Sequence, residues 1–333
     1  MRPIDHYRDA KKVGFGTIKS LLVMLPDLFV LLRKIVPIWS IKRWCMENHN
    51  TQMAVDRMAA INGALGDAWG FHWEQDTATH DFDYDFSYLI PKDAVMMYSG
   101  GLDSFIQWRL LGKPKCVYFD IGHKASHSEF IRICKATEDL GLDLTRITDL
   151  NLEKFEMDNA YIPYRNLFFI MLASLRSPNV VIAQISEWAP DKNSGFYRKT
   201  EHLLNGIRKG KFQGLNMGEV SIYSPFSGWT KTELVREYIS RWPAEDLERY
   251  SWSCYSNGLI PCGKCTACVS RHIAMTNNGI EEKTAEPVDI HLLTKKLSIK
   301  DFKIHNIPMY LKRYNEMRKY KKLTGYDQKR ANG

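Results

Sequence analysis

The chain has 333 residues, a mass of 38.6 kDa, 44% hydrophobic and 25% charged residues, and a formal net charge of +8 at pH 7. These values are ordinary for a folded protein and exclude a wholly disordered or fibrous chain. The longest mostly apolar stretch, residues 21–32, is interrupted by Pro26 and Asp27, so no segment has the roughly 18 to 20 uninterrupted apolar residues that span a bilayer.

The first 90 residues are predicted to form a mainly helical N-terminal extension whose function the sequence does not indicate. Between residues 11 and 46 apolar residues recur at helical spacing, although Pro26 would kink or split that helix. Two core helices and a membrane-surface helix both fit this pattern. Residues 77–85 (TATHDFDYD) predict an acidic loop. The N-terminus lacks the apolar core and cleavage site of a signal peptide.

From Asp93 onwards, strand and helix patterns alternate, which predicts a parallel sheet with helices on both faces, a Rossmann-like α/β fold. Ligands of such sheets bind at the carboxyl ends of the strands. Residues 91–280 are predicted to form this domain, and residues 281–333 a basic helical tail. The predicted strands are 93–99, 115–122, 142–150, 179–186 and 219–225, and the predicted helices are 102–111, 128–140, 163–175, 196–209, 230–242 and 309–322.

The most informative segment is the string MMYSGGLDS, where a predicted strand runs into a predicted helix. Gly100 and Gly101 let the backbone turn sharply and approach a ligand without a Cβ atom. N–H groups of the turn and of the helix N-terminus make an anion site, to which Ser99 and Ser104 add hydroxyl groups. The Asp103 carboxylate would repel a phosphate, so we interpret it as a magnesium ligand or as the helix cap. A simple capped turn without a ligand is the alternative.

Four of the seven cysteines fall within 15 residues, in the spacing C-x7-C-x2-C-x2-C. Four thiolates this close can surround one ion tetrahedrally, which predicts a structural zinc site; an iron–sulfur cluster, disulfides and free thiols are the alternatives. The other three, Cys45, Cys116 and Cys134, lie in apolar surroundings and are predicted to be buried thiols. This cysteine usage is typical of a cytoplasmic enzyme rather than of a secreted disulfide scaffold. The predicted metal ligands are Cys254, Cys262, Cys265 and Cys268.

Basic residues are concentrated at the two ends of the chain. Residues 1–45 carry nine basic and three acidic side chains, residues 46–92 two basic and eight acidic ones, and residues 311–330 eight basic and two acidic ones. Such ends favour contact with nucleic acid or another anionic partner, but solvated helix faces have the same composition. Both interpretations stay open, and we also expect a homo-oligomer.

The strings SGGLDS, SCY and CGKCTAC, in this order, resemble the 7-cyano-7-deazaguanine synthase (QueC-like) family of N-type ATP pyrophosphatases, whose phosphate loop reads SGGxDS. The resemblance covers residues 93–280 and includes YIPYRNLFFIML and IYSPFSGWTKTELV. It implies that Lys231 lies near the ATP phosphates and that Asp103, Ser104 and Lys231 are catalytic. The ATP-binding residues that it implies are Tyr98, Ser99, Gly100, Gly101, Leu102, Asp103, Ser104, Arg165 and Asn166.

This family uses ATP and ammonia to convert 7-carboxy-7-deazaguanine into 7-cyano-7-deazaguanine through adenylated intermediates. The resemblance therefore implies an ATP-dependent carbon–nitrogen ligase of queuosine biosynthesis. It also implies structural Zn²⁺, Mg²⁺ that accompanies ATP, and small-molecule substrates.

Two stretches depart from the family pattern. The family reads D-Y-G-Q-x-H where this chain has DIGHKAS, so His123 takes the glutamine position and Ala125 the histidine position. The family's substrate loop reads S-G-Y-P-D-C-R where this chain has SGFYRKT, with Arg198 and Lys199 in place of a carboxylate. His123 and Arg198 are therefore the predicted substrate contacts.

The departures leave two further functions open. One is adenylation of a different carboxylate, on a modified base, a protein or a nucleic acid. The other is an inactive zinc-knot protein that binds nucleic acid, although the intact SGGLDS loop argues against lost catalysis.

Overall fold

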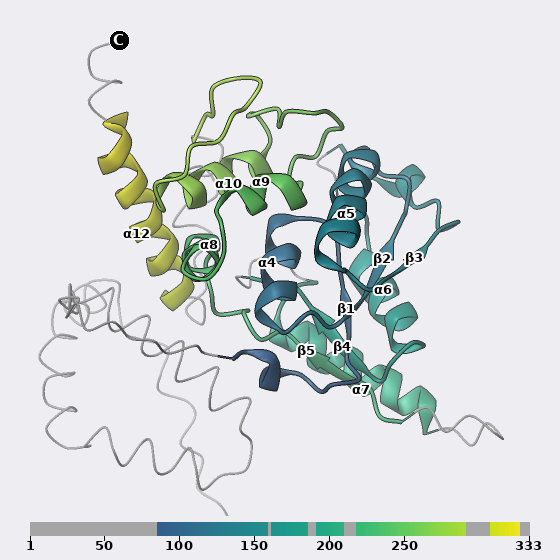
Figure 1. Ribbon diagram of the computed structural model, residues 1–333. Helices are drawn as coiled ribbons and strands as arrows, with labels where there is room; N and C mark the ends of the chain where they lie inside the picture. The colour runs from purple at the N-terminus through teal and green to yellow at the C-terminus, as the bar shows by residue number, and fades with distance from the viewer. Residues whose placement is uncertain (1–84, 159–160, 186–190, 210–217, 291–306, 327–333) are drawn as a thin grey trace, which may run out of the picture. The chain divides into compact units, whose positions relative to one another are not determined.

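The computed structural model of the chain describes residues 85–158, 161–185, 191–209, 218–290 and 307–326 (Figure 1). The whole chain divides into two compact units, residues 1–57 and 58–333, and the described residues all belong to the second. The helices predicted between residues 11 and 46, with their membrane-surface alternative, and most of the loop predicted at 77–85 lie outside the described residues. The predicted domain limits stay predictions.

The described strands form one parallel sheet in the spatial order β3-β2-β1-β4-β5. From β1 the chain moves outward to β2 and β3, then returns past β1 to β4 and β5. The connections that leave β1 and β4 therefore run to opposite sides, which opens a crevice at the carboxyl ends of these strands. The strands are β1 (Val95–Met97), β2 (Lys115–Phe119), β3 (Leu144–Ile147), β4 (Asn179–Ile182) and β5 (Ser221–Tyr223).

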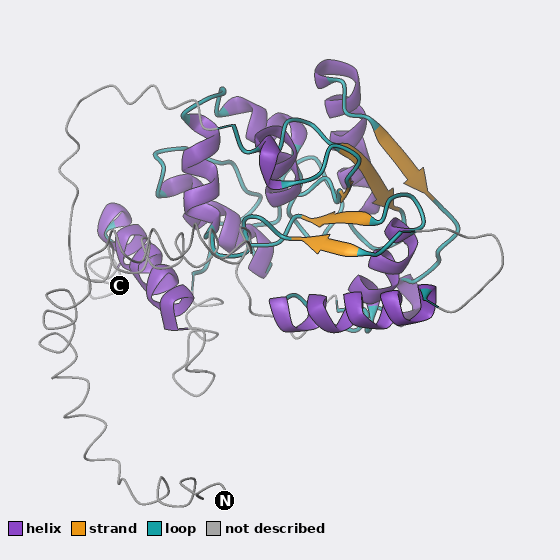
Figure 2. Ribbon diagram, turned by 90° about the horizontal axis from the view of Figure 1, so that it is seen from below, coloured by secondary structure: helices purple, strands orange, loops and turns teal. Residues whose placement is uncertain are grey.

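Helices cover both faces of the sheet because the strand side chains alternate between two apolar cores (Figure 2). Met96 and Tyr98 pack into the core that holds α4, α5, α8, α9 and α10. Val95 and Met97 pack into the core that holds α6 and α7. The Rossmann-like α/β fold predicted from the sequence is thus confirmed. These helices are α4 (Leu102–Leu110), α5 (Ser126–Leu140), α6 (Arg165–Ser174), α7 (Ser194–Arg208), α8 (Lys231–Ile239), α9 (Glu245–Tyr250) and α10 (Thr266–Thr276).

Each strand and helix predicted between residues 93 and 242 is present, with its ends shifted by a few residues. The largest shifts have local causes. For example, α6 begins at Arg165 because Tyr164 has a φ of 61°, a left-handed conformation that a right-handed helix does not contain. Four elements were not predicted from the sequence, because each is short or overlaps the cysteine pattern. They are the helices α9 and α10 and the 3-10 turns η1 (Ser87–Leu89) and η2 (Glu153–Phe155).

The tail helix α12 (Ile307–Thr324) is longer than predicted and is not simply a solvated surface helix. Met317 and Tyr320 are buried against Val269 and Ile273 of α10, while Arg318 and Lys319 are exposed. Residues three positions apart lie on one side of a helix, which gives α12 an apolar side and a basic side. In the part of the chain that the structure describes, no helix combines the length and apolar character needed to cross a membrane.

Candidate functional site

The loop between β1 and α4 places two glycines at the mouth of the crevice. Gly100 has a φ of 70°, and a Cβ atom there would lie 3.2 Å from the carbonyl oxygen of Glu129, so the turn requires glycine. Gly101 is the N-cap of α4. The Ser104 hydroxyl donates to the Gly101 carbonyl at 2.9 Å and lies 3.2 Å from the Ser99 Oγ. The loop therefore has the glycine turn, helix N-terminus and paired hydroxyls that an anion site uses.

Asp103 forms an ion pair with Lys231 of α8, across 128 positions of sequence. Lys231 is positioned by a capping box, in which the Thr230 Oγ1 accepts the Glu233 N–H at 3.2 Å and the Glu233 carboxylate accepts the Thr230 N–H at 2.7 Å. Asp103 is not the helix cap, because that position belongs to Gly101. The pair is only partly buried and is accessible to a ligand.

A cavity of about 480 Å³, here the loop cavity, opens beside this ion pair. Its lining includes Gly101, three cationic residues, Lys192, Lys231 and Arg313, and three carboxylates, Asp103, Glu129 and Glu316. Although part of Lys192 is exposed, the surrounding protein lowers its pKa by desolvation, and the charge of Arg165 acts in the same direction. Cations held this close favour an anion with several charges.

A second cavity of about 330 Å³, the sheet cavity, lies over the carboxyl ends of β1, β2 and β4. Its lining is mixed. Its apolar part includes Met97, Ile182 and the rings of Phe119 and Phe169, which stack at 4.4 Å between centroids. Ser99, Asp103, Glu129 and Lys192 line both cavities, so the two join at the loop. A cavity with aromatic walls joined to one that offers three cationic side chains suits a ligand with a flat ring and an anionic tail.

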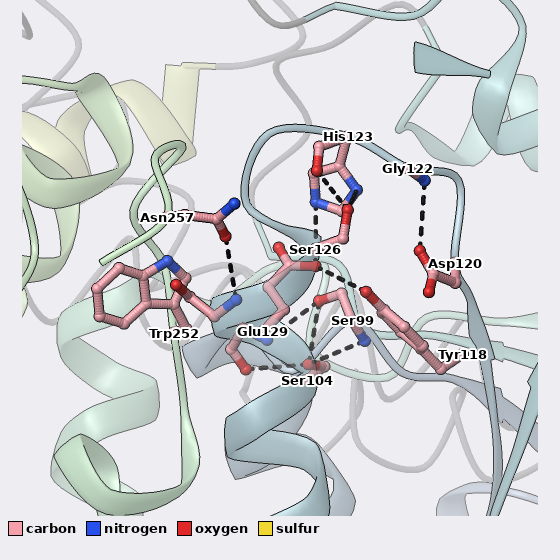
Figure 3. Close-up of polar contacts among 12 residues, drawn as sticks. Ser99, Ser104, Tyr118, Asp120, Gly122, His123, Ser126, Glu129, Trp252 and Asn257 are labelled. Atoms are coloured by element: carbon pink, nitrogen blue, oxygen red, sulfur yellow. Dashed lines mark hydrogen bonds and ion pairs between the residues drawn. The ribbon is translucent and has the colours of Figure 1, made fainter. Parts of the chain in front are cut away.

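Polar side chains gather around Glu129 where the two cavities meet (Figure 3). The His123 Nε2 lies 3.1 Å from the Glu129 carboxylate, which also accepts the Tyr118 hydroxyl at 3.5 Å. Desolvation lowers the pKa of His123, but the hydrogen bond and the charge of Glu129 outweigh it, so that pKa lies above its ordinary value. Burial, with the charge of Glu129 adding to it, raises the pKa of Tyr118. His123 therefore lines the sheet cavity as a half-buried group whose pairing with Glu129 favours its charged form.

Arg165 and Asn166, at the start of α6, also line the sheet cavity. The Asn166 side chain donates to the Asp191 carboxylate at 2.8 Å, which holds the chain next to Lys192. Tyr164, whose backbone has the left-handed conformation, directly precedes this first turn of α6. The structure thus places these two residues at a cavity that Ser99 and Asp103 also line, and their role in ATP binding stays a prediction.

The four clustered cysteines converge, with all four Sγ atoms within 4.8 Å of one another. Backbone N–H groups donate to three of the sulfurs at 3.3–3.4 Å: those of residues 256 and 262 to Cys254, that of residue 264 to Cys262, and that of residue 268 to Cys265. Hydrogen bonds with Cys254 and Cys268, of which the bond with Cys254 has the larger effect, hold the pKa of the Cys265 thiol well below its usual value. Four converging sulfurs with N–H donors around them can hold a metal ion.

The cysteine cluster is joined to the loop through the residues just before it. The Trp252 N–H donates to the Gly100 carbonyl at 2.8 Å, and the Ser253 hydroxyl accepts the Leu102 N–H at 3.4 Å. Trp252 also packs with Cys254 and Cys268. The shape of the loop therefore depends on a segment that the cysteine cluster anchors.

The structure gathers most of the predicted site residues around the two cavities, but not Arg198. Arg198 is exposed on α7 and is not among the described residues that line either cavity. Of the other cysteines, Cys116 is buried as predicted, Cys134 is only half-buried, and Cys45 lies outside the described residues. The lining also includes residues that the sequence did not single out, namely Glu129, Lys192, Trp252, Tyr255 and Arg313. Three of these had a signal: Lys192 follows a predicted strand closely, Tyr255 belongs to the SCY string, and Arg313 lies among the basic residues 311–330.

These features define a Rossmann-like α/β protein with a glycine loop at the switch point of its sheet and a four-cysteine metal-type cluster beside it. Residues 116–279 match the family model described as queuosine biosynthesis protein QueC. The match begins after the glycine loop, so the loop is assigned from its own geometry and sequence.

Three relatives carry the name 7-cyano-7-deazaguanine synthase. The protein of Acidobacterium capsulatum is 26% identical over 54% of this chain and 89% of its own length. That of Methanosarcina mazei is 25% identical over 59% of this chain and 99% of its own length. That of Prochlorococcus marinus subsp. pastoris is 29% identical over 55% of this chain and 93% of its own length. The resemblance to this family that the motifs indicated is therefore confirmed.

Proposed function

We propose that this protein binds ATP in the joined cavities and uses it to activate a carboxylate for attack by ammonia. The phosphates would lie in the loop cavity, beside Asp103, Lys192 and Lys231, and the adenosine in the sheet cavity. The observation that carries this proposal is the junction of a cationic and an aromatic cavity at a glycine loop on the switch point of the sheet.

The chemistry explains why a phosphate site is needed. A carboxylate is a poor acyl donor because its leaving group would be oxide. Attack of a carboxylate oxygen on the α-phosphorus expels pyrophosphate and leaves an acyl adenylate, from which ammonia displaces AMP to give an amide. A second adenylation, at the amide oxygen, expels a second pyrophosphate, and loss of AMP and of both protons of the amide nitrogen then gives a nitrile. The protein's part is to neutralise charge and align the reactants.

The relatives' printed name supports 7-cyano-7-deazaguanine as the product. The family resemblance implies 7-carboxy-7-deazaguanine as the acceptor. The conversion is that of an ATP-dependent carbon–nitrogen ligase. Support comes from the geometry as well: Glu129, where the two cavities meet, offers a carboxylate to an N–H edge.

Two metal ions belong to this proposal. The donor set of four cysteine sulfurs fits Zn²⁺ in a closed structural site, held by Cys254, Cys262, Cys265 and Cys268. For Mg²⁺, which prefers oxygen, the Asp103 carboxylate and the hydroxyls of Ser99 and Ser104 are the donors at the loop. When bound there, Mg²⁺ would neutralise phosphate charge.

The test is a product analysis with the full chain, ATP, 7-carboxy-7-deazaguanine and ¹⁵N-labelled ammonium. We expect a labelled nitrile and two AMP for each nitrile formed. Asp103→Asn should lower the rate of AMP formation at least about 100-fold and leave the protein folded. The size of this effect is that expected when one electrostatic group at the reacting centre is lost. Asp143→Asn, at an exposed carboxylate before β3, is the matched control and should keep full activity. Wild-type protein that forms neither AMP nor pyrophosphate would contradict the proposal.

A second candidate keeps ATP activation but changes the acceptor. It is favoured by His123, an imidazole paired with Glu129 that lines the sheet cavity where the family has glutamine. Slow AMP formation with the deazaguanine acid, stimulated by another carboxylate, would select this candidate.

A further inference from the structure

Helix α12 is tied to the start of α8, the helix that carries Lys231 (Figure 1). Lys312, which is only 7% exposed, lies 2.9 Å from one carboxylate oxygen of Glu233 and also donates to the Gly228 carbonyl at 3.1 Å. Glu233 is the acidic member of the capping box that begins α8. A buried ammonium with two such partners fixes the position of α12 against this turn.

A second set of contacts lies one turn further along α12. The Glu316 carboxylate accepts the N–H of Thr232 at 3.1 Å, and the Glu316 carbonyl accepts the Asn277 side chain at 3.1 Å. Thr232 directly follows Lys231. Contacts on both sides of Arg313 in the sequence thus hold this part of α12 beside the loop.

Arg313, between these anchors, lines the loop cavity together with Gly101, Asp103, Ser104 and Lys231. Burial lowers the pKa of Arg313, while the charges of Glu316 and Asp103 act in the opposite direction. The guanidinium of Arg313 therefore lies close enough to Asp103 for their charges to interact. An arginine stays charged in such surroundings. The loop cavity therefore receives from α12, beyond residue 279, where the match to the family ends, a permanent positive charge together with the Glu316 carboxylate.

We propose that α12 is part of the nucleotide site and that Arg313 binds the phosphate groups of the nucleotide in the loop cavity. The inference rests on the proposed function, since it assumes that the loop cavity takes phosphates. A planar guanidinium binds two phosphate oxygens through parallel N–H groups in a fixed geometry, whereas each lysine ammonium acts as a point charge. Lys312 acts as a positioning residue, because it holds Arg313 in place through Glu233 and Gly228.

The test is calorimetric titration of the full chain with inorganic pyrophosphate and with MgATP. Arg313→Gln should weaken pyrophosphate binding about 10- to 100-fold, as expected for lost hydrogen bonds to a charged group. Arg313→Lys should retain part of the affinity. Arg318→Gln is the matched control on the same helix, since Arg318 is exposed, and it should bind within about twofold of wild type.

A second measurement needs no variant. Phenylglyoxal modifies accessible arginines, and peptide mass spectrometry reports each site. Pyrophosphate should protect Arg313 and leave Arg318 reactive.

The outcomes separate the two proposals. Wild-type protein that binds neither pyrophosphate nor MgATP overturns the proposed function and this inference together. Wild-type binding that Arg313→Gln leaves unchanged, or Arg313 modified equally with and without pyrophosphate, overturns this inference alone. A variant that raises only the KM for the acid acceptor overturns it as well, because Arg313 would then contact the acceptor.

Discussion

His123 shows how one side chain couples the candidate site to pH. Its imidazole pairs with the Glu129 carboxylate, and its pKa lies above the ordinary value of 6.5. A group whose pKa is raised by folding adds stability that is fully present below its unfolded pKa and is lost as the pH rises through the folded pKa. The window of the effect therefore begins near pH 6.5 and extends upward.

We expect His123→Gln to be less stable than wild type at about pH 5.5, by on the order of 1 kcal/mol, and this difference to shrink at about pH 8.5. Urea unfolding at a series of pH values measures it. His202→Gln, at an exposed histidine of α7, is the control and should show a difference that does not change with pH. A His123→Gln difference that grows with pH would refute the assigned pair.

At the scale of elements, the turn from β1 to α4 is the most constrained connection at the site. Gly100 is left-handed, and a Cβ atom there would meet Ile133 at 3.1 Å and the Glu129 carbonyl at 3.2 Å, both from α5. Gly206 lies inside α7, and a Cβ atom there would meet nothing within 4 Å. The same substitution at these two glycines should therefore have opposite effects.

Gly100→Ala should lower the free energy of unfolding by about 1–2 kcal/mol, because alanine disfavours the left-handed conformation. It should also weaken nucleotide binding, since the loop must shift away from α5. Gly206→Ala should raise the free energy of unfolding by about 0.5–1 kcal/mol, because glycine is a poor residue inside a helix. Denaturant unfolding of both variants checks this pair, and a neutral Gly100→Ala would show that the turn tolerates a side chain.

For the molecule as a whole, the cysteine cluster connects segments that would otherwise be held weakly. It anchors Trp252 and Ser253, which bond to the loop. Beyond Cys254, the Asn257 side chain accepts the Ser128 N–H at 3.1 Å and so holds the start of α5. None of the four cysteines is among the described residues that line the two cavities, so any effect on ligand binding must act through these contacts.

Cys265→Ser, or metal removal by a chelator, should lower the melting temperature and also weaken ATP binding, because metal binding and folding of such a cluster are coupled. Metal content by elemental mass spectrometry, thermal melting and nucleotide titration measure the three quantities. Cys134→Ser, at a half-buried thiol of α5 outside the cluster, is the control and should keep its metal. A Cys265→Ser variant with unchanged metal content and melting temperature would contradict the assignment.

Local patterns were sufficient for the elements of the sheet, the glycine loop and the cysteine cluster. Alternating apolar runs, a diglycine turn and closely spaced thiols are properties of neighbouring residues, so they can be recognised without coordinates. Contacts between distant segments were not readable in this way. The pairing of Asp103 with Lys231, the Trp252 bond to Gly100 and the place of Arg313 at the loop cavity each join residues more than 120 positions apart. Which distant side chains meet depends on how the helices pack on the sheet, and that packing is a property of the folded chain.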